Sequence, residues 1–409
     1  MNKSFTTVLG GSMLVAGTAI GAGMLALPMI SAGMWFFWSL GLLLISWFLM
    51  YRASQAILEV NLHYQPGDSF HTLVRDLLGP GWSTANGLAV AFVLYILVYA
   101  YVSGGGSVIQ QSMSSVLGVE PPRILASLLF ALLLAACIWW SSRTVDRFSV
   151  LLMGGMVISF LLSIGGMMDN MRLSTLLDKT GGGGEAIFIW AAVSSYLTSF
   201  CFHASVPSLV KYMGHDAKTI NACLRWGTLV ALVCYLLWIL AADGLIPREQ
   251  FKDVIAAGGN VGNLVAAAGS NLNSGLILRI LEAFSLLAVA TSFLGAGLGL
   301  FDYMADLCKF DDSRTGRSKT LLVTFAPPII CGLIWPNGFL LAIGWAGLAA
   351  AFWSVIVPAL LLRAARQRFS GHGYQVPGGA LLPPLLLAYG ILVAVCHTCF
   401  VFDLLPMYK

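Results

Sequence analysis

Apolar residues occur along this chain in long runs that are separated by short polar segments. A helix needs about 20 mostly apolar residues to cross the hydrocarbon core of a bilayer. Runs of about that length predict 11 transmembrane helices, near residues 6–29, 33–58, 85–113, 123–140, 147–168, 187–211, 221–242, 276–305, 319–335, 338–363 and 380–402. The expected fold class is therefore an all-α polytopic membrane protein, with residues 1–409 forming one domain.

The first of these spans is interrupted in its middle by the stretch GTAIGAGMLALP, residues 17–28. Gly21, Ala22 and Gly23 lie at its centre, and Pro28 follows one turn later. Non-helical backbone at membrane depth is tolerated only where it is buried in protein or lines a wet cavity. Close packing of helices through small residues is the alternative reading of Gly17 and Gly21.

The sixth span carries a second interruption, formed by Pro207 and the small residues Ala204, Ser205 and Ser208. Five spans separate the starts of the first and sixth spans, so the second set of helices enters the membrane with opposite polarity. Paired broken helices at corresponding positions of two inverted halves indicate the binding site of a secondary transporter. The pattern therefore favours transport over other membrane functions.

Composition and charge support this class and predict an orientation. Hydrophobic residues make up 58% of the chain and charged residues 10%, whereas a soluble domain carries about 25% charged residues. With the N-terminus inside, 15 of the 22 Lys and Arg residues fall on the inner side and the remaining 7 on the outer side. The positive-inside rule then predicts a cytoplasmic N-terminus and an external C-terminus.

Two connecting segments are long enough to form structure of their own. The inner segment 61–82 has an amphipathic middle, and the outer segment 243–275 has a charged first half and an apolar second half. Long loops of this kind are often lids over a site. A pair of interfacial helices without a gating role is the alternative for 243–275.

Other functional classes find little support in the sequence. The spans contain no HExxH motif, no paired carboxylates and no Ser–His pair, so we expect no enzyme and no resident cofactor or metal. No phosphate-binding loop and no basic block for nucleic acid is present. A non-concentrating channel or an amino-acid sensor of the same fold remains the alternative to a transporter.

Several motifs resemble those of the bacterial hydroxy and aromatic amino acid permeases. They are GTAIGAGMLALP, FVLYILVYAYVSGGGS, SFCFHASVPSL, ATSFLGAGLGLFDYMADL, and TFAPP with WPNGF. The likeness covers essentially the whole chain and is greatest to the tryptophan-specific permeases, with tyrosine permeases next. It implies a LeuT-like fold, with residues 5–168 and 187–363 as inverted repeats and 380–403 as an extra helix. It also implies cation-driven symport of an aromatic amino acid, tryptophan first and then tyrosine, by a monomer in the bacterial inner membrane.

The resemblance also implies a substrate site at the two interruptions. The backbone at Ala22 and Gly23 would bind the substrate carboxylate, and carbonyls near Ala19 and Phe200, beside Ser199, would bind its ammonium group. The remaining candidates would surround the aromatic side chain, and they are Tyr95, Tyr99 and Ser103 on one helix face, with Phe200 and Phe202 as stacking rings. Plain core packing is the alternative reading of these aromatic residues.

The coupling ion is left open between a proton and sodium. The resemblance implies a lysine at the position where this chain has Met156, and in proton-coupled relatives of this fold that lysine occupies the place of a sodium ion. Ala288, Thr291 and Ser292 resemble half of a sodium site, which the carbonyls of Gly17 and Ile20 would complete. His203 is the ionisable residue nearest mid-membrane and is the proton-coupling candidate. A neutral histidine bonded to a backbone carbonyl is its alternative reading.

Overall fold

The computed structural model describes residues 3–178, 184–369 and 373–408, and every regular element in these ranges is helical. Nine helical runs in this part of the chain are long and apolar enough to cross a membrane. They are α3 (Trp35–Asn61), α5 (Pro80–Leu117), α6 (Arg123–Trp140), α7 (Ser142–Asp169), α11 (Ala217–Leu245), α14 (Gly275–Cys308), α15 (Arg314–Ile334), the continuous run of α16, η2 and α17 (Phe339–Arg368), and α18 (Leu382–Val401). The expectation of an all-α polytopic membrane protein is confirmed.

The first predicted span consists of two helices. α1 (Lys3–Ala19) and α2 (Ala22–Ser31) meet at Ile20 and Gly21 and are bent by 53°. The sixth predicted span is also divided, into α9 (Ile189–Ser199) and α10 (Ser205–Met213), with residues 200–204 between them. With 11 and 9 residues, each of these helices is too short to cross a bilayer alone. Counting the bent pair as one span gives up to ten candidate spans in the described residues.

Shorter helices occupy the connections. They are α4 (Phe70–Leu78), α8 (Leu173–Leu176), η1 (Glu185–Phe188), α12 (Gln250–Ala256), α13 (Val261–Asn271) and η3 (Gly379–Leu381), while η2 (Phe352–Ile356) is a π-helical turn between α16 (Phe339–Ala351) and α17 (Val357–Arg368). The amphipathic segment contains α4, which begins where the Ser69 side chain accepts a hydrogen bond from the Thr72 N–H. The outer segment contains α12 and α13, although α11 continues to Leu245, three residues into the predicted loop.

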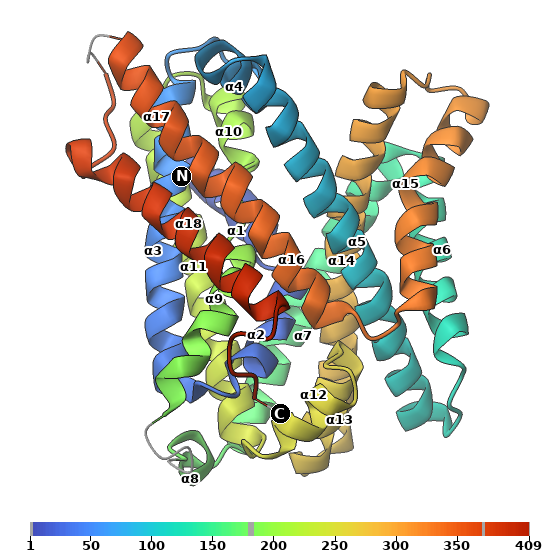
Figure 1. The fold of residues 1–409 in the computed structure, drawn as a ribbon. Helices are drawn as coiled ribbons and strands as arrows, with labels where there is room; N and C mark the ends of the chain where they lie inside the picture. The colour runs from blue at the N-terminus through green and yellow to red at the C-terminus, as the bar shows by residue number, and fades with distance from the viewer. Residues whose placement is uncertain (1–2, 179–183, 370–372, 409) are drawn as a thin grey trace.

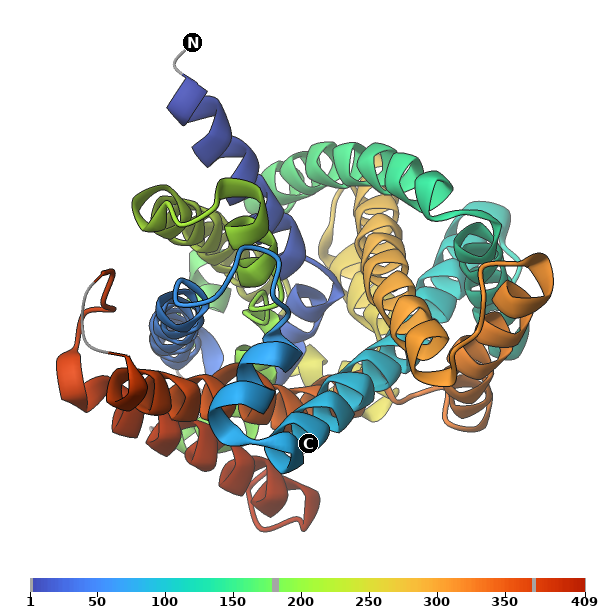
Figure 2. The ribbon, with the colours of Figure 1, turned by 90° about the horizontal axis from the view of Figure 1, so that it is seen from above.

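The half-helix α2 lies in the middle of the bundle (Figures 1 and 2). It contacts α3, α9, α11, α14 and α16 and buries eight of its ten residues. Nearby, α16 approaches α9 so closely that a Cβ atom at Gly347 would overlap the Ser194 carbonyl oxygen. Small residues at such crossings let membrane helices pack backbone to backbone. The interrupted helices are therefore held inside a closely packed frame.

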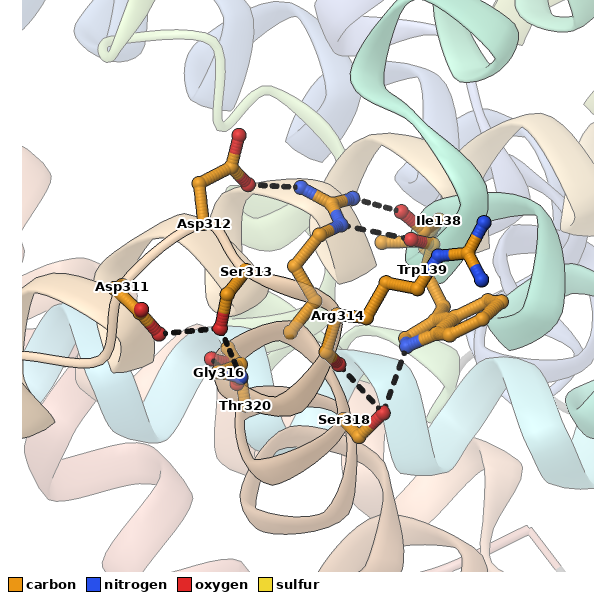
Figure 3. A network of polar contacts seen from close by, with 10 residues as sticks. Ile138, Trp139, Asp311, Asp312, Ser313, Arg314, Gly316, Ser318 and Thr320 are labelled. Carbon is orange, nitrogen blue, oxygen red and sulfur yellow. Dashed lines mark hydrogen bonds and ion pairs between the residues drawn. The ribbon is translucent and has the colours of Figure 1, made fainter.

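At the edge of the bundle, α6 and α15 lie side by side and share a polar network (Figure 3). Arg317 donates to the carbonyl oxygens of Trp139 at 2.8 Å and Ile138 at 2.7 Å, and it pairs with Asp312 at 2.7 Å. The last carbonyls of a helix have no partner within the helix. Arg317 supplies partners at the end of α6 and so ties that end to the start of α15.

Candidate functional site

The start of α2 is fixed by α14. The Ala22 N–H donates to the Ser292 Oγ at 2.8 Å, and Ser292 donates to the Ala288 carbonyl at the same distance. A Cβ atom at Gly21 would clash with the Ser292 hydroxyl, so the glycine leaves room for this contact. The first backbone N–H groups of a helix are free donors with a partial positive charge. Ser292 binds one of them in this arrangement.

The second interruption faces the first. A Cβ atom at Gly23 would lie 3.7 Å from the Ser199 Cα, and the Ser199 hydroxyl lies 3.5 Å from the Gly23 carbonyl oxygen. Ser199 is the last residue of α9. After it, the N–H groups of residues 200 and 201 donate to the carbonyls of Leu197 and Thr198, three residues earlier in each case. The N-terminus of α2 and the C-terminus of α9 are thus neighbours, although they lie 176 residues apart in sequence.

Tyr235 on α11 joins the two interruptions directly. Its hydroxyl lies 2.6 Å from the carbonyl oxygen of Ala19, where α1 ends, and 2.6 Å from that of Ser199, where α9 ends. The side chain is fully buried, and its ring packs on Phe200 with centroids 5.0 Å apart. Because a phenol has one hydrogen, it donates to one of these two carbonyls at a time.

The structure therefore brings one part of the sequence-predicted substrate site together. Ala19, Ala22, Gly23, Ser199 and Phe200 gather around the two interruptions, with Ser292 and Tyr235 as their polar neighbours. Tyr235 was missed by sequence reasoning because it lies within an ordinary apolar run. Only the long-range fold gives it two helix ends as partners.

The histidine candidate lies on another side of the interruption. His203 is buried and its Nε2 lies 3.0 Å from the Met50 carbonyl oxygen on α3, so Nε2 carries a hydrogen. Its Nδ1 has no hydrogen-bond partner among the described residues. Phe202 stacks on the imidazole at 4.9 Å, and Trp353 meets it edge-on at 6.2 Å. Phe202 and His203 thus form a packed aromatic group with α3 and η2.

The remaining substrate candidates lie on the face of α5 that meets α15. Tyr95 donates to the Val323 carbonyl at 2.9 Å, Tyr99 to the Trp335 carbonyl at 2.8 Å, and Ser103 to the Pro336 carbonyl at 2.5 Å. In the part of the chain that the structure describes, the hydrogen bonds of these three side chains do not reach the α1–α2 or α9–α10 interruptions. In this arrangement they tie α5 to α15 and to the turn that follows it.

Tyr95 and Tyr99 also line a cavity of about 700 Å³ between α5, α15 and α16. Its other lining residues are mostly apolar, and they include Phe92, Pro327, Trp335 and Trp345. The polar atoms of both tyrosines are already bonded to backbone carbonyls. The cavity therefore offers apolar surface rather than free polar groups.

The WPNGF motif is explained by these contacts. The Trp335 and Pro336 carbonyls accept the hydrogen bonds from α5, and the Asn337 side chain accepts one from Asn260 at 3.1 Å. A Cβ atom at Gly338 would overlap the Tyr99 hydroxyl. The Asn260 Oδ1 lies 3.0 Å from the Ser103 hydroxyl, which shares its one hydrogen between this oxygen and the Pro336 carbonyl and so fastens the start of α13 to α5. The motif is thus a junction between three helices.

Three of the coupling-ion candidates, Ala288, Thr291 and Ser292, lie on α14, and the other two, Gly17 and Ile20, lie at the end of α1. The Thr291 hydroxyl lies 2.9 Å from the Leu287 carbonyl, 3.1 Å from the Ala288 carbonyl and 3.7 Å from the Met156 sulfur on α7. Gly17 on α1 faces α7, since a Cβ there would lie 3.2 Å from the Met153 methyl group. Ile20 donates its N–H to the Ala16 carbonyl as α1 ends. Met156 thus lies beside Thr291, one of the residues that the sequence analysis assigns to the candidate sodium site.

The C-terminal end of α2 is held by Arg248, which sequence reasoning did not single out. Arg248 is 3% exposed and donates to the carbonyl oxygens of Ala32 at 3.1 Å and Gly33 at 2.5 Å, in the turn between α2 and α3. It also pairs with Glu185 at 3.4 Å. Tyr408 near the C-terminus lies over its guanidinium, 5.3 Å from the ring centroid. Arg248 therefore joins the α2–α3 turn to η1 and to the C-terminal segment.

The acidic residues in and near the long helices differ in their partners. Glu59 receives two hydrogen bonds from Arg366, at 2.7 and 2.9 Å, and one from the Val376 N–H at 2.6 Å. Glu282 accepts from Ser115 at 2.6 Å. Asp302 and Asp306 are exposed near the end of α14. Asp243, two residues before the end of α11, is fully buried and was assigned to a loop by the sequence analysis.

Outside the spans, the pKa of one tyrosine, Tyr64, is raised. Burial raises the pKa of the Tyr64 phenol, and the hydrogen bond to Asp76 at 2.6 Å raises it further. Asp76 is in turn paired with Arg368 at 2.8 Å. This group joins the start of the connection before α4 to the end of α17, and it lies apart from the interruptions.

Comparison with known proteins identifies the family. The model of the tryptophan/tyrosine permease family matches residues 4–397. The chain is 52% identical to a tryptophan-specific transport protein of Pseudomonas aeruginosa, covering 98% of this chain and 97% of that one, and 46% identical to one of Shigella flexneri with the same coverage. It is 38% identical to a tyrosine permease of Enterobacter agglomerans over the full length of both.

Solved structures support the fold. A mutant manganese transporter from Eremococcus coleocola superposes with a TM-score of 0.60, covering 98% of this chain and 88% of that one. The two share 14% sequence identity, so the similarity concerns the fold alone. Together, the family match and the full-length relatives show that this chain belongs to the tryptophan/tyrosine permease family.

Proposed function

We propose that this permease imports an aromatic amino acid, tryptophan first and tyrosine next, across the bacterial cytoplasmic membrane by ion-driven symport. The observation that carries the proposal is the meeting of two interrupted helices in the middle of the bundle, with Tyr235 between them. The names of the most similar relatives support the choice of tryptophan. The family's transport role also argues against an enzyme.

The two interruptions supply opposite charges for an amino acid. The N-terminus of α2, at Ala22 and Gly23, carries the partial positive charge of the helix dipole and favours a carboxylate, which would replace Ser292 as the acceptor for the Ala22 N–H. The carbonyl ends of α1 and α9, at Ala19, Ser199 and Phe200, favour an ammonium group. Because Tyr235 donates to the same carbonyls, an arriving ammonium group takes over hydrogen bonds that the phenol makes without substrate.

The aromatic side chain of the substrate would lie against Phe200, whose ring is fully buried beside the interruptions. Phe202, Tyr95, Tyr99 and Ser103 remain part of the proposed pocket, and they need a movement of α5 or of residues 200–204 to reach the substrate. Alternating access supplies movements of this kind in repeat-built transporters.

We also propose the finer architecture of 11 transmembrane helices, with α1–α2 and α9–α10 each counted as one broken span. Residues 5–168 and 187–363 would form two inverted repeats, followed by the extra helix 380–403. The interruptions at corresponding places support this arrangement. The excess of Lys and Arg in the inner loops supports a cytoplasmic N-terminus and a periplasmic C-terminus, with 243–275 as an external lid.

The test is uptake of labelled tryptophan into proteoliposomes under an inward pH gradient or an inward sodium gradient. Accumulation above the external concentration under one gradient supports symport and names the coupling ion. Equilibration without accumulation would support a channel instead, and binding without flux would support a sensor. Tyrosine is tested second, since small differences in a pocket change affinity by only about 1–3 kcal/mol.

The candidate sodium site has its own test in the double variant Thr291→Ala with Ser292→Ala. If sodium drives uptake through these hydroxyls and the carbonyls of Gly17, Ile20 and Ala288, we expect the sodium concentration for half-maximal uptake to rise at least about tenfold, the equivalent of about 1.4 kcal/mol of lost ion binding. Uptake assayed over a range of sodium concentrations measures this. The matched control is Thr398→Ala on α18, whose hydroxyl also donates to the carbonyl four residues before it. An unchanged sodium dependence in the double variant would remove the site.

A further inference from the structure

Asp243 is a buried carboxyl group that the substrate site does not use. Its exposed fraction is 0%, and neither carboxylate oxygen has a hydrogen-bond partner among the described residues. The buried acids Glu59 and Glu282 differ, because both accept hydrogen bonds. An ionised carboxylate is strongly disfavoured where it is removed from water without partners. The packing around Asp243 therefore suits the protonated form.

Few charged groups surround this carboxyl. Arg248 lies near enough for its charge to act on Asp243, but the two do not form an ion pair. Tyr196 on α9 lies near enough for the charge of an ionised Asp243 to act on it. Arg172 and Asp169 adjoin the end of α11 through the Arg172 N–H, which donates to the Gly244 carbonyl, but both side chains are exposed. The helices α2, α8 and α13, which also pack on α11, carry no titratable side chain.

The charged parts of the other neighbours lie toward the opposite end of α11. The Tyr51 hydroxyl on α3 donates to Asn221 near the start of α11, and this places Arg52 and Glu59 toward that start. Lys211 and Tyr212 end α10, directly before α11 begins. On the outer segment, Glu249 is ion-paired with Lys252 at 3.0 Å. Arg248 is thus the cation best placed to respond to Asp243.

Arg248 links this carboxyl to the first broken helix. In the present arrangement its guanidinium donates to the Ala32 and Gly33 carbonyls and to Glu185, and so holds the turn at the outer end of α2. A carboxylate is a stronger acceptor for a guanidinium than a carbonyl oxygen is. When Asp243 loses its proton, its charge competes with the two carbonyls for Arg248, and the hold on α2 weakens.

We propose that the Asp243 carboxyl is a proton-binding site of the transporter, and that its protonation is linked to closure of the outer end through Arg248. A proton from the outer solution binds to a carboxylate oxygen of Asp243, the carboxyl becomes neutral, and Arg248 engages the α2–α3 turn. Net symport then requires that this proton leave toward the inside later in the cycle. The inference rests on the proposed import of tryptophan and assigns its coupling ion as a proton.

The test compares the wild type, Asp243→Asn and the control Glu282→Gln in proteoliposomes. Two measurements are made: accumulation of labelled tryptophan under an inward pH gradient, and exchange of labelled for unlabelled tryptophan without a gradient. The asparagine is nearly isosteric with a protonated carboxyl, so we expect it to keep exchange within about threefold of the wild type. Accumulation by this variant should fall at least about tenfold and become independent of external pH, whereas Glu282→Gln should accumulate normally.

The outcomes separate this inference from the proposed function. If the wild type accumulates neither tryptophan nor tyrosine under either gradient, the proposed function fails. If the wild type is driven by sodium alone, or if Asp243→Asn accumulates tryptophan like the wild type, the inference is overturned and transport stands. Loss of exchange together with accumulation, in a variant with wild-type thermal stability, would also overturn it. If the asparagine variant is not inserted, Asp243→Ser is measured by the same two assays, with Asp243→Glu expected to retain accumulation.

Discussion

At the scale of single residues, Tyr235 lies within hydrogen-bond distance of more acceptors than it can donate to. One phenolic hydrogen faces two carbonyl oxygens at equal distance, so Tyr235 can donate to one of them but not to both at once. An ammonium group brings three donors and can satisfy both carbonyls. The arrangement therefore stabilises the empty site while leaving it able to bind an amine.

Tyr235→Phe removes this hydrogen bond and leaves both buried carbonyls unpaired. A typical hydrogen bond contributes about 0.5–1.5 kcal/mol, and this one stabilises only the empty site, so we expect the KM for tryptophan to fall by about two- to tenfold at equal protein levels in the membrane. Initial uptake rates over a range of tryptophan concentrations give Vmax and KM separately. Tyr389→Phe is the matched control, because Tyr389 is also buried but bonds Ser46 on α3. Equal rates in both variants would show that Tyr235 has no role at the interruptions.

Sequence reasoning at this scale found the backbone positions but not all of their partners. Gly21, Ala22 and Gly23 are visible as helix breakers in an apolar run, and the structure places α2 at this point. Tyr235 and Arg248 have no local pattern, because their roles depend on contacts with residues 36 to more than 200 positions away. The signal for Asp243 was an acid beside the end of an apolar run, and a helix end misplaced by three residues hid it.

At the scale of elements, Tyr95 compensates for a proline in a neighbouring helix. Pro327 lies inside α15 and has no N–H, so the carbonyl of Val323, four residues earlier, has no helical donor. The Tyr95 hydroxyl of α5 donates to this carbonyl at 2.9 Å. A helix interruption in α15 is thus satisfied from α5, as membrane helices with internal prolines require.

This pairing predicts a specific coupling between two substitutions. Tyr95→Phe leaves the Val323 carbonyl unpaired and should destabilise the protein by about 1–2 kcal/mol. Adding Pro327→Ala restores an N–H donor within α15, so Tyr95→Phe should cost about 1 kcal/mol less in that background. Thermal unfolding of the four proteins in detergent measures the difference.

The control for this cycle is Tyr99→Phe. Its acceptor, the Trp335 carbonyl, lies beyond the end of α15 and is not freed by Pro327. Pro327→Ala should therefore leave the effect of Tyr99→Phe unchanged. An equal loss for Tyr95→Phe with and without the proline would contradict the proposed compensation.

Helical periodicity and run length predicted most elements, and the differences have physical causes. The apolar runs located nine continuous candidate spans and one bent pair, α1–α2, in the described residues. The ends differ where polar residues still continue a helix, as in α5, which begins at Pro80 rather than near 85 and ends at Leu117 rather than near 113. Capping residues and buried neighbouring residues determine where such a helix ends, and a hydropathy pattern alone carries no information about either.

At the scale of the whole molecule, the distribution of basic residues predicts which end faces the cytoplasm. Cys308 ends α14 and is exposed, while the other seven cysteines are half-buried or buried. With the N-terminus inside, Cys308 lies on the cytoplasmic side. Leu404, which is 71% exposed near the C-terminus, lies on the periplasmic side.

A membrane-impermeant maleimide added outside should therefore leave Cys308 unlabelled until the membrane is permeabilised. The matched variant carries Cys308→Ala with Leu404→Cys and should be labelled from outside without permeabilisation. Mass spectrometry of the purified protein measures the labelled fraction at each site. The reverse pattern would invert the proposed topology, and with it the side from which Asp243 receives its proton.

The contact between Tyr99 and Gly338 also has a consequence for sequence evolution. A Cβ atom at position 338 would overlap the Tyr99 hydroxyl, and the hydrogen bond of Tyr95 has a purpose only where Pro327 has removed a donor. Selection therefore acts on pairs rather than on single positions. Among relatives, a side chain at 338 should be accompanied by a smaller residue at 99, and loss of the proline at 327 should relax the requirement for tyrosine at 95. Correlated substitutions at positions 99 and 338, and at 95 and 327, would then be expected among members of the family.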